Sequence, residues 1–264
     1  GALPGVKLFD AHTGEERWGV AEKDGYARVA FTADGWHVVA LVGMRLLVLD
    51  AADGRPLARH SRRIAAFATT PEPGELLALT AGMDIAEFRR LNLLSGEVLW
   101  RKPLRYHGGI ARMALSPDGR TVGTVGDWEA LLLDVGTRAA TFVHRMRSDD
   151  GRPAALAFAP DGGAFVFAER GTLHACRTDS LDPSAAVRTD GPAFRDLAFR
   201  RDGKALFAAR GGSAVEEWDA RSWERARAFD WKSGNLGCVA VSPDGALGAA
   251  GSGSGKVVVW DVDV

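Results

Sequence analysis

Short apolar runs of four or five residues alternate with turn-forming residues along the whole chain. They include Val38 to Val42, Leu46 to Leu49, Leu76 to Leu79, Ala164 to Phe167 and Val257 to Trp260. These runs are rich in β-branched and aromatic residues, and clusters of Gly, Pro, Asp and Ser bound them. No window of comparable length shows the 3.6-residue apolar spacing of an amphipathic helix. The pattern predicts an all-β protein.

A turn that contains Asp and Gly recurs between these runs. It stands at Ala33-Asp34-Gly35, Pro117-Asp118-Gly119, Pro160-Asp161-Gly162, Arg201-Asp202-Gly203 and Pro243-Asp244-Gly245, with a variant at Glu72-Pro73-Gly74. The glycines are separated by 39, 45, 43, 41 and 42 residues. Pro and Asp favour the first positions of a turn, and Gly adopts the positive φ that closes a hairpin. Six turns of one kind predict six hairpins of one kind.

A second marker, an apolar strand that ends in Asp or Asn, runs in phase with the first. Its copies are Phe9-Asp10, Leu49-Asp50, Leu91-Asn92, Leu133-Asp134, Trp218-Asp219 and Trp260-Asp261, with a degenerate copy at Arg177-Thr178. The steps between successive copies are 40, 42, 42, 44, 41 and 42 residues. A repeat of about 42 residues with four short strands predicts one blade of a β-propeller.

The repeats resemble those of the WD-repeat β-propeller family, in a degenerate, bacterial-type form. The last repeat is nearest to the family pattern, with Ser242-Pro243-Asp244-Gly245, then Gly251 to Gly255, then the strand Lys256 to Asp261. The likeness covers essentially the whole chain. It implies four-stranded antiparallel blades that pack face to face, in a ring closed by an outer strand.

Two features of the family pattern are weak in this chain. The family's Gly-His pair is missing from every repeat, and only Asp127 stands at the tight turn where the family places a structural aspartate. We therefore expect apolar packing between blades to provide more of the stability. The residues expected to provide it include Phe31, Leu115, Phe158, Phe199 and Val241.

The two markers differ by one in number, which bears on how the ring closes. We expect a single domain over residues 1–264 with six blades, which start near residues 26, 64, 109, 152, 193 and 236. The last blade lacks an outer strand, and Glu16 to Val20, in a closing segment of residues 1–20, is placed to supply it and remove a free edge. Val6 to Phe9 would then form a fifth strand or be loose. The alternative is a seven-bladed ring whose missing strands lie in other sequence or in a second copy.

Composition and charge narrow the classes of partner. The chain has 33 Lys and Arg against 34 Asp and Glu, which argues against bulk attraction to nucleic acid or to an anionic membrane. No stretch approaches the about 20 apolar residues of a membrane span, and no signal-peptide pattern begins the chain. A signal peptide already removed by processing would leave no trace in this sequence. We expect a cytoplasmic protein, and the Arg-, Ala- and Gly-rich composition suggests a bacterial source.

The resemblance implies that one face of the propeller, formed by loops between strands, carries the binding residues. Arg and aromatic residues, which are enriched at binding hot spots, predict a partner-binding face for a protein or peptide with an acidic segment. The alternative is that these loops are polar only because they are exposed to solvent. The residues of this face are Arg62, Arg63, Arg105, Tyr106, His107, Trp128, Arg145, Arg147, Arg170, Arg210, Trp231 and Lys232.

A second group of charged residues lies where the first strands of the blades begin. Arg28, Arg112, Arg195 and Asp196 are predicted to line the mouth of the central channel. They could bind an anion or a peptide carboxylate. The alternative is a solvated ring of ion pairs.

The sequence offers no catalytic motif of the hydrolase, P-loop or Cys-His kind. The histidines at 12, 37, 60, 107, 144 and 174 are scattered over different repeats, and Cys176 and Cys238 form no C-x-x-C pair. We therefore expect no catalytic residue, no metal and no cofactor. The predicted function is a scaffold for protein–protein interaction, monomeric on its own.

The alternative function is a metal-dependent small-molecule enzyme similar to the propeller lactonases. That class uses acidic and asparagine ligands in the channel. This chain has only Asn92 and Asn235, and its expected channel positions are mostly basic.

Overall fold

The computed structural model describes residues 5–22, 27–60, 63–81, 85–105, 110–127, 129–145, 155–169, 171–180 and 183–263. Within these residues the chain is all-β, as predicted, with 25 strands and no helix. No described segment forms a helix that is long and apolar enough to cross a membrane. The chain forms two compact units, Gly1–Ile110 and Ala111–Val264.

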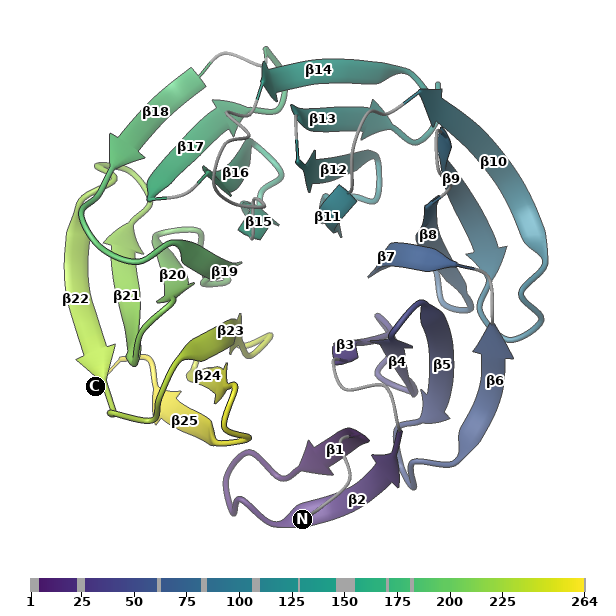
Figure 1. The fold of residues 1–264 in the computed structure, drawn as a ribbon, viewed down its shortest axis with the longest axis horizontal. Helices are drawn as coiled ribbons and strands as arrows, with labels where there is room; N and C mark the ends of the chain where they lie inside the picture. Colours follow the sequence, from purple (N-terminus) through teal and green to yellow (C-terminus); the bar gives the residue numbers. More distant parts are fainter. Residues whose placement is uncertain are drawn as a thin grey trace. The chain divides into compact units, whose positions relative to one another are not determined.

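The first unit contains a two-stranded hairpin and two four-stranded antiparallel sheets (Figure 1). The hairpin pairs β1 (Gly5–Phe9) with β2 (Glu16–Ala21). The next sheet consists of β3 (Ala27–Phe31), β4 (His37–Val42), β5 (Arg45–Asp50) and β6 (Pro56–His60). The other consists of β7 (Ile64–Thr69), β8 (Glu75–Ala81), β9 (Ile85–Asn92) and β10 (Val98–Arg105).

The second unit contains three four-stranded sheets and one sheet of three strands. The four-stranded sheets consist of β11 (Ile110–Leu115), β12 (Thr121–Gly126), β13 (Glu129–Asp134) and β14 (Ala140–Arg145); of β15 (Ala155–Phe158), β16 (Ala164–Glu169), β17 (Thr172–Arg177) and β18 (Pro183–Arg188); and of β19 (Phe194–Phe199), β20 (Ala205–Arg210), β21 (Ala214–Asp219) and β22 (Arg225–Asp230). The last sheet consists of β23 (Leu236–Val241), β24 (Leu247–Ser252) and β25 (Val257–Asp261).

Every sheet has its strands in chain order, joined by antiparallel hairpins, which is the architecture of a propeller blade. The predicted fold class is therefore confirmed: the described strands form six blades of a β-propeller, five with four strands and the last with three. The first strands begin at residues 27, 64, 110, 155, 194 and 236, each within three residues of the expected blade start.

The Asp-Gly turns close the first hairpin of the blades by local chemistry. In the turn between β3 and β4, the carboxylate of Asp34 accepts hydrogen bonds from the Thr32 hydroxyl (2.5 Å) and from the Trp36 amide (3.0 Å). Gly35 follows with a φ of 73°, which costs glycine nothing. The same hydroxyl-to-aspartate pattern recurs at Ser116–Asp118 and Ser242–Asp244.

Apolar side chains from neighbouring sheets make up the core of each unit. In the second unit, Phe165 and Phe167 of β16 are fully buried against Val125 of β12 and Leu132 of β13. The apolar clusters join side chains of neighbouring sheets, so packing between blades holds the unit together.

The N-terminal segment differs from the prediction. Glu16 to Val20 was expected to complete the last blade, but β2 pairs with β1, with Val6 opposite Val20, and the sheet β23–β25 has three strands. Val6 to Phe9 is neither loose nor a fifth strand. The reason is local: Asp10 caps the tight turn between β1 and β2 by accepting hydrogen bonds from two backbone amides.

The hairpin is anchored to the sheet β3–β6 by packing. Val6 and Trp18 are buried against Val38 and Leu47. The Trp18 indole also donates a hydrogen bond to the Ala51 carbonyl (3.0 Å). Burial of these side chains favours local pairing of β1 with β2.

Candidate functional site

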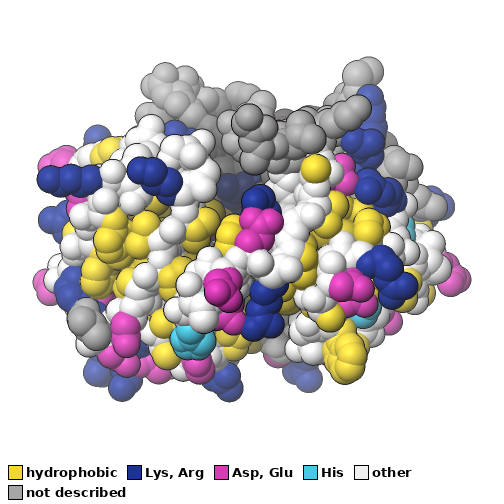
Figure 2. All heavy atoms as spheres, turned by 90° about the horizontal axis from the view of Figure 1, so that it is seen from below, with side chains coloured by type: hydrophobic (Ala, Val, Ile, Leu, Met, Phe, Trp, Pro, Cys, Tyr) yellow, Lys and Arg dark blue, Asp and Glu magenta, His cyan; other side chains and the backbone are white. Residues whose placement is uncertain are grey.

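The predicted partner-binding face is only partly described. Arg62, Tyr106, His107, Trp128, Arg147 and Arg170 lie outside the described residues, as does the side chain of Arg105. Arg63, Arg145 and Lys232 are exposed. The side of the molecule drawn in Figure 2, turned by 90° from the view of Figure 1, shows basic and acidic side chains interspersed among hydrophobic ones.

Arg210 does not belong to a loop surface, which corrects the prediction. It ends the fully buried strand β20 and is only 5% exposed. Its guanidinium donates to the Pro192 carbonyl (2.8 Å), pairs with Glu216 (3.3 Å) and lies 4.5 Å from the ring centroid of Phe194. This arginine is therefore a structural residue whose charge is matched inside the unit.

Trp231 is also a packing residue. Its ring stacks on Phe229, with centroids 5.7 Å apart and planes 6° from parallel, and lies 4.9 Å from the ring of Trp260. Half-buried in this aromatic group, it offers a partner less surface than an exposed loop tryptophan would.

The residues predicted at the channel mouth fall into different environments. Arg28 is half-buried on β3 of the first unit, and Arg195 is exposed on β19 of the second. Arg112 and Asp196, both in the second unit, interact electrostatically, and the Asp196 carboxylate accepts a hydrogen bond from the Val239 amide (3.0 Å). Because desolvation is the largest influence on both side chains, a fully solvated ring of ion pairs does not describe this pair.

Burial dominates the chemistry of Asp196. It raises the pKa of this carboxyl to about 6, although the Val239 amide and the Arg112 charge both favour the ionised form. Burial also lowers the pKa of Arg112 and raises that of the neighbouring Cys238 thiol. Partial removal of the charged Asp196 and Arg112 side chains from water therefore lowers the stability of the folded state.

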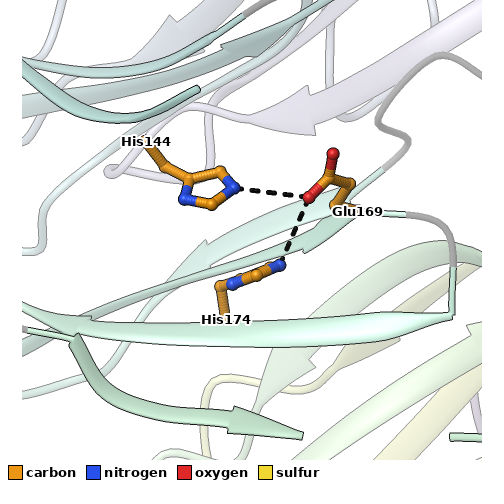
Figure 3. A group of neighbouring side chains, drawn as sticks. All are labelled: His144, Glu169 and His174. Atoms are coloured by element: carbon orange, nitrogen blue, oxygen red, sulfur yellow. Dashed lines mark hydrogen bonds and ion pairs between the residues drawn. The ribbon is translucent and has the colours of Figure 1, made fainter. Parts of the chain in front are cut away.

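A second group of side chains meets between two neighbouring sheets of the second unit (Figure 3). Glu169 ends β16 and His174 lies on β17, the strand paired with it. His144 comes from β14, the last strand of the preceding sheet. The side chains of Glu169 and His174 are 13% and 16% exposed, and that of His144 is 34% exposed.

The two imidazoles point at the same carboxylate oxygen. The Oε2 atom of Glu169 lies 3.3 Å from Nε2 of His144 and 3.5 Å from Nε2 of His174. The three atoms all lie within 4.8 Å of one another. The buried Nε2 of His174 lacks the geometry of a hydrogen bond to any described atom.

Aromatic packing holds the His174 ring in this orientation. The ring stacks on Phe167, which lies opposite it on β16, with centroids 4.9 Å apart and planes 10° from parallel. The His144 ring lies 4.6 Å from that of His174. Because Phe167 is fully buried, His174 has little freedom to turn away.

Burial, and then the nearby His144, lower the pKa of His174 below its ordinary value of 6.5, and the Glu169 carboxylate opposes this effect. Burial therefore favours the neutral imidazole of His174. A neutral imidazole can accept a hydrogen bond or bind a metal ion through its unprotonated nitrogen.

The group opens into a pocket of about 490 Å³. Besides His144, Glu169 and His174, its lining consists of Gly171, Thr172, Arg188, Thr189, Asp190 and Gly191. The Thr189 amide and hydroxyl both donate to the Gly171 carbonyl at 2.9 Å, which ties the two loops at the rim together. A small ligand or water can reach the group through this pocket.

Compared with known proteins, the sequence matches no protein-family model and no curated protein. The assignment of the propeller fold is therefore based on the structure alone.

Sequence reasoning missed the His144–Glu169–His174 group because it searched for ligand spacing along the chain. One signal was present: a tight hairpin between Glu169 and Thr172 places Glu169 and His174 on one face of a sheet. The arrival of His144 from another blade has no signal in the spacing.

Proposed function

We propose that this protein is an interaction scaffold of the WD-repeat type that binds a protein or peptide partner without catalysis. The observation that carries the proposal is an uncovered apolar strip on β3. There Val29 is 57% and Phe31 is 51% exposed, and the two side chains lie on one face of the strand.

Three later blades bury the residue at the position of Val29. Val29 pairs with Ala40, and the equivalent residues of these three blades are Leu156, Leu197 and Val239. All three are buried. Phe31, expected from the sequence to pack between blades, is instead exposed.

Strand β1 provides a place for a partner's backbone next to this strip. In the part of the chain that the structure describes, β1 has one hydrogen-bonded neighbour, β2. An extended segment with alternating apolar residues can pair with a free strand edge and cover an adjacent apolar surface.

The test is capture of partners by the intact protein and by a Val29→Ser, Phe31→Ser variant, with Leu94→Ser as a matched control. Leu94 is 50% exposed in a turn, so the control removes a comparable apolar side chain elsewhere. We expect a partner that the intact protein and the control retain and the variant loses, with amides of β1 protected from hydrogen exchange in the complex.

Two outcomes would contradict this proposal. One is equal capture by all three proteins. The other is a concentration-dependent dimer of the intact protein, lost in the double variant, because a second copy would then cover the strip.

A metal-dependent small-molecule enzyme is the second candidate function. The His144–Glu169–His174 group beside a pocket favours it. Lactone hydrolysis by the zinc-supplemented protein, lost on His174→Ala, would support the enzyme; its absence across a lactone series would leave the scaffold as the better account.

A further inference from the structure

We infer that His144, Glu169 and His174 form a binding site for one divalent transition-metal ion of the zinc class, within the second unit. The inference does not depend on the proposed scaffold function. It stands on the ligand geometry, on an unsatisfied buried nitrogen and on the rigidity of the supporting strands.

Two of the three separations between the ligand atoms match those around a tetrahedral ion, and the third, between the two imidazole nitrogens, is at most 4.8 Å. An ion bound at about 2.0–2.1 Å holds neighbouring tetrahedral ligands about 3.3–3.4 Å apart. Nε2 of His144 and Nε2 of His174 lie 3.3 and 3.5 Å from Oε2 of Glu169. Little movement is needed to bring all three atoms onto one ion.

In the cluster without a metal, the His174 imidazole lacks a hydrogen bond at its buried Nε2 atom to any of the described atoms around it. A buried polar atom without a partner is costly. A metal ion at the centre would give this nitrogen a partner and would use the carboxylate oxygen that both imidazoles face (Figure 3).

The surrounding structure is suited to hold such an ion. Stacking on Phe167 fixes the His174 ring, and β16 and β17 place Glu169 and His174 on one face of a sheet. The adjoining pocket leaves a fourth coordination position open to water or a small anion. Arg188 on the pocket lining can interact with an anion bound there.

The ligand types select the class of ion. Two imidazole nitrogens and one carboxylate suit Zn²⁺, Co²⁺, Ni²⁺ and Cu²⁺. Ca²⁺ and Mg²⁺ prefer sites built from oxygen atoms alone.

The test is calorimetric titration of the chelator-stripped protein with Zn²⁺, together with the visible absorption of a Co²⁺ complex. We expect one ion per chain and the intense Co²⁺ bands of a four-coordinate site. His144→Ala and His174→Ala should each weaken Zn²⁺ binding by at least about tenfold. His12→Ala, which changes an exposed histidine outside the group, should leave binding unchanged.

Because His174 is largely buried, its variant could fail to fold, whereas the more exposed His144 permits the same test at the edge of the group. The inference is overturned if the intact protein binds no Zn²⁺ in the micromolar range, or if His144→Ala binds it as tightly as the intact protein.

Discussion

The buried carboxyl of Asp196 makes stability depend on pH in a direction that a surface aspartate would not show. Replacing it by asparagine keeps the shape and the acceptor for the Val239 amide but removes the titration. The change also leaves Arg112 without its acidic neighbour, which adds a destabilising offset that does not vary with pH near neutrality.

The magnitude follows from the change in pKa on folding. Folding raises the pKa of Asp196 from 3.8 to about 6, so the folded state binds this proton more tightly than the unfolded state does. Below pH 3.8 the carboxyl is protonated in both states and has no effect. As the pH rises through about 6, ionisation in the folded state costs up to about 3 kcal/mol, since each pKa unit corresponds to about 1.4 kcal/mol.

The assay is urea unfolding of the intact protein and of Asp196→Asn at about pH 4.5 and about pH 7.5. Relative to the variant, the intact protein should lose about 2 kcal/mol of unfolding free energy between the two pH values. Asp10→Asn is the control: the hydrogen bonds of Arg17 and of two backbone amides hold the pKa of Asp10 well below its usual range, so its titration lies outside this window.

Two results would refute this reasoning about Asp196. One is a difference between the intact protein and Asp196→Asn that is equal at both pH values. The other is a difference that changes in the opposite sense.

Two further substitutions test the packing of the second unit. Arg210→Leu leaves the buried carboxylate of Glu216 with only the largely exposed Arg225 as an ion-pair partner, and should lower the unfolding free energy by about 3 kcal/mol in urea unfolding. The exposed Arg195→Leu should change it little, and equal effects would contradict the structural role of Arg210. Gly248→Ala should cost about 1–3 kcal/mol in thermal unfolding, because its Cβ would lie 2.2 Å from the ring of a neighbouring tryptophan; Gly237→Ala, which meets open space, is the control, and a neutral Gly248→Ala would show that the tryptophan can move.

The chain's own pattern was enough to predict the blades. The Asp-Gly turns act within a few residues, through hydroxyl-to-carboxylate hydrogen bonds and a glycine with positive φ, as at Thr32 to Gly35. Apolar runs between such turns can only form short strands, and their period sets the number of sheets. For this reason strand positions and blade starts followed from local chemistry.

The sites depended on contacts that no local pattern specifies. Arg210 is like any arginine after an apolar run until β20 is seen to be buried on both faces. His144 and His174 are 30 residues apart, in different blades, and only the packing of β14 on the next sheet brings them to Glu169. Asp10 closes the hairpin β1–β2 locally, but the anchoring of that hairpin to the first four-stranded sheet depended on burial of Trp18.

The sequence by itself thus determined the all-β class, the repeat and the hairpins, because turn chemistry and strand periodicity act over a few residues. Only the tertiary structure decided which charges are buried, which apolar strip on β3 stays open, and which imidazoles share a carboxylate. These properties arise where one blade packs on another. Burial and desolvation, which set the pKa of Asp196 and the partners of Arg210, depend on neighbours that are distant in the chain.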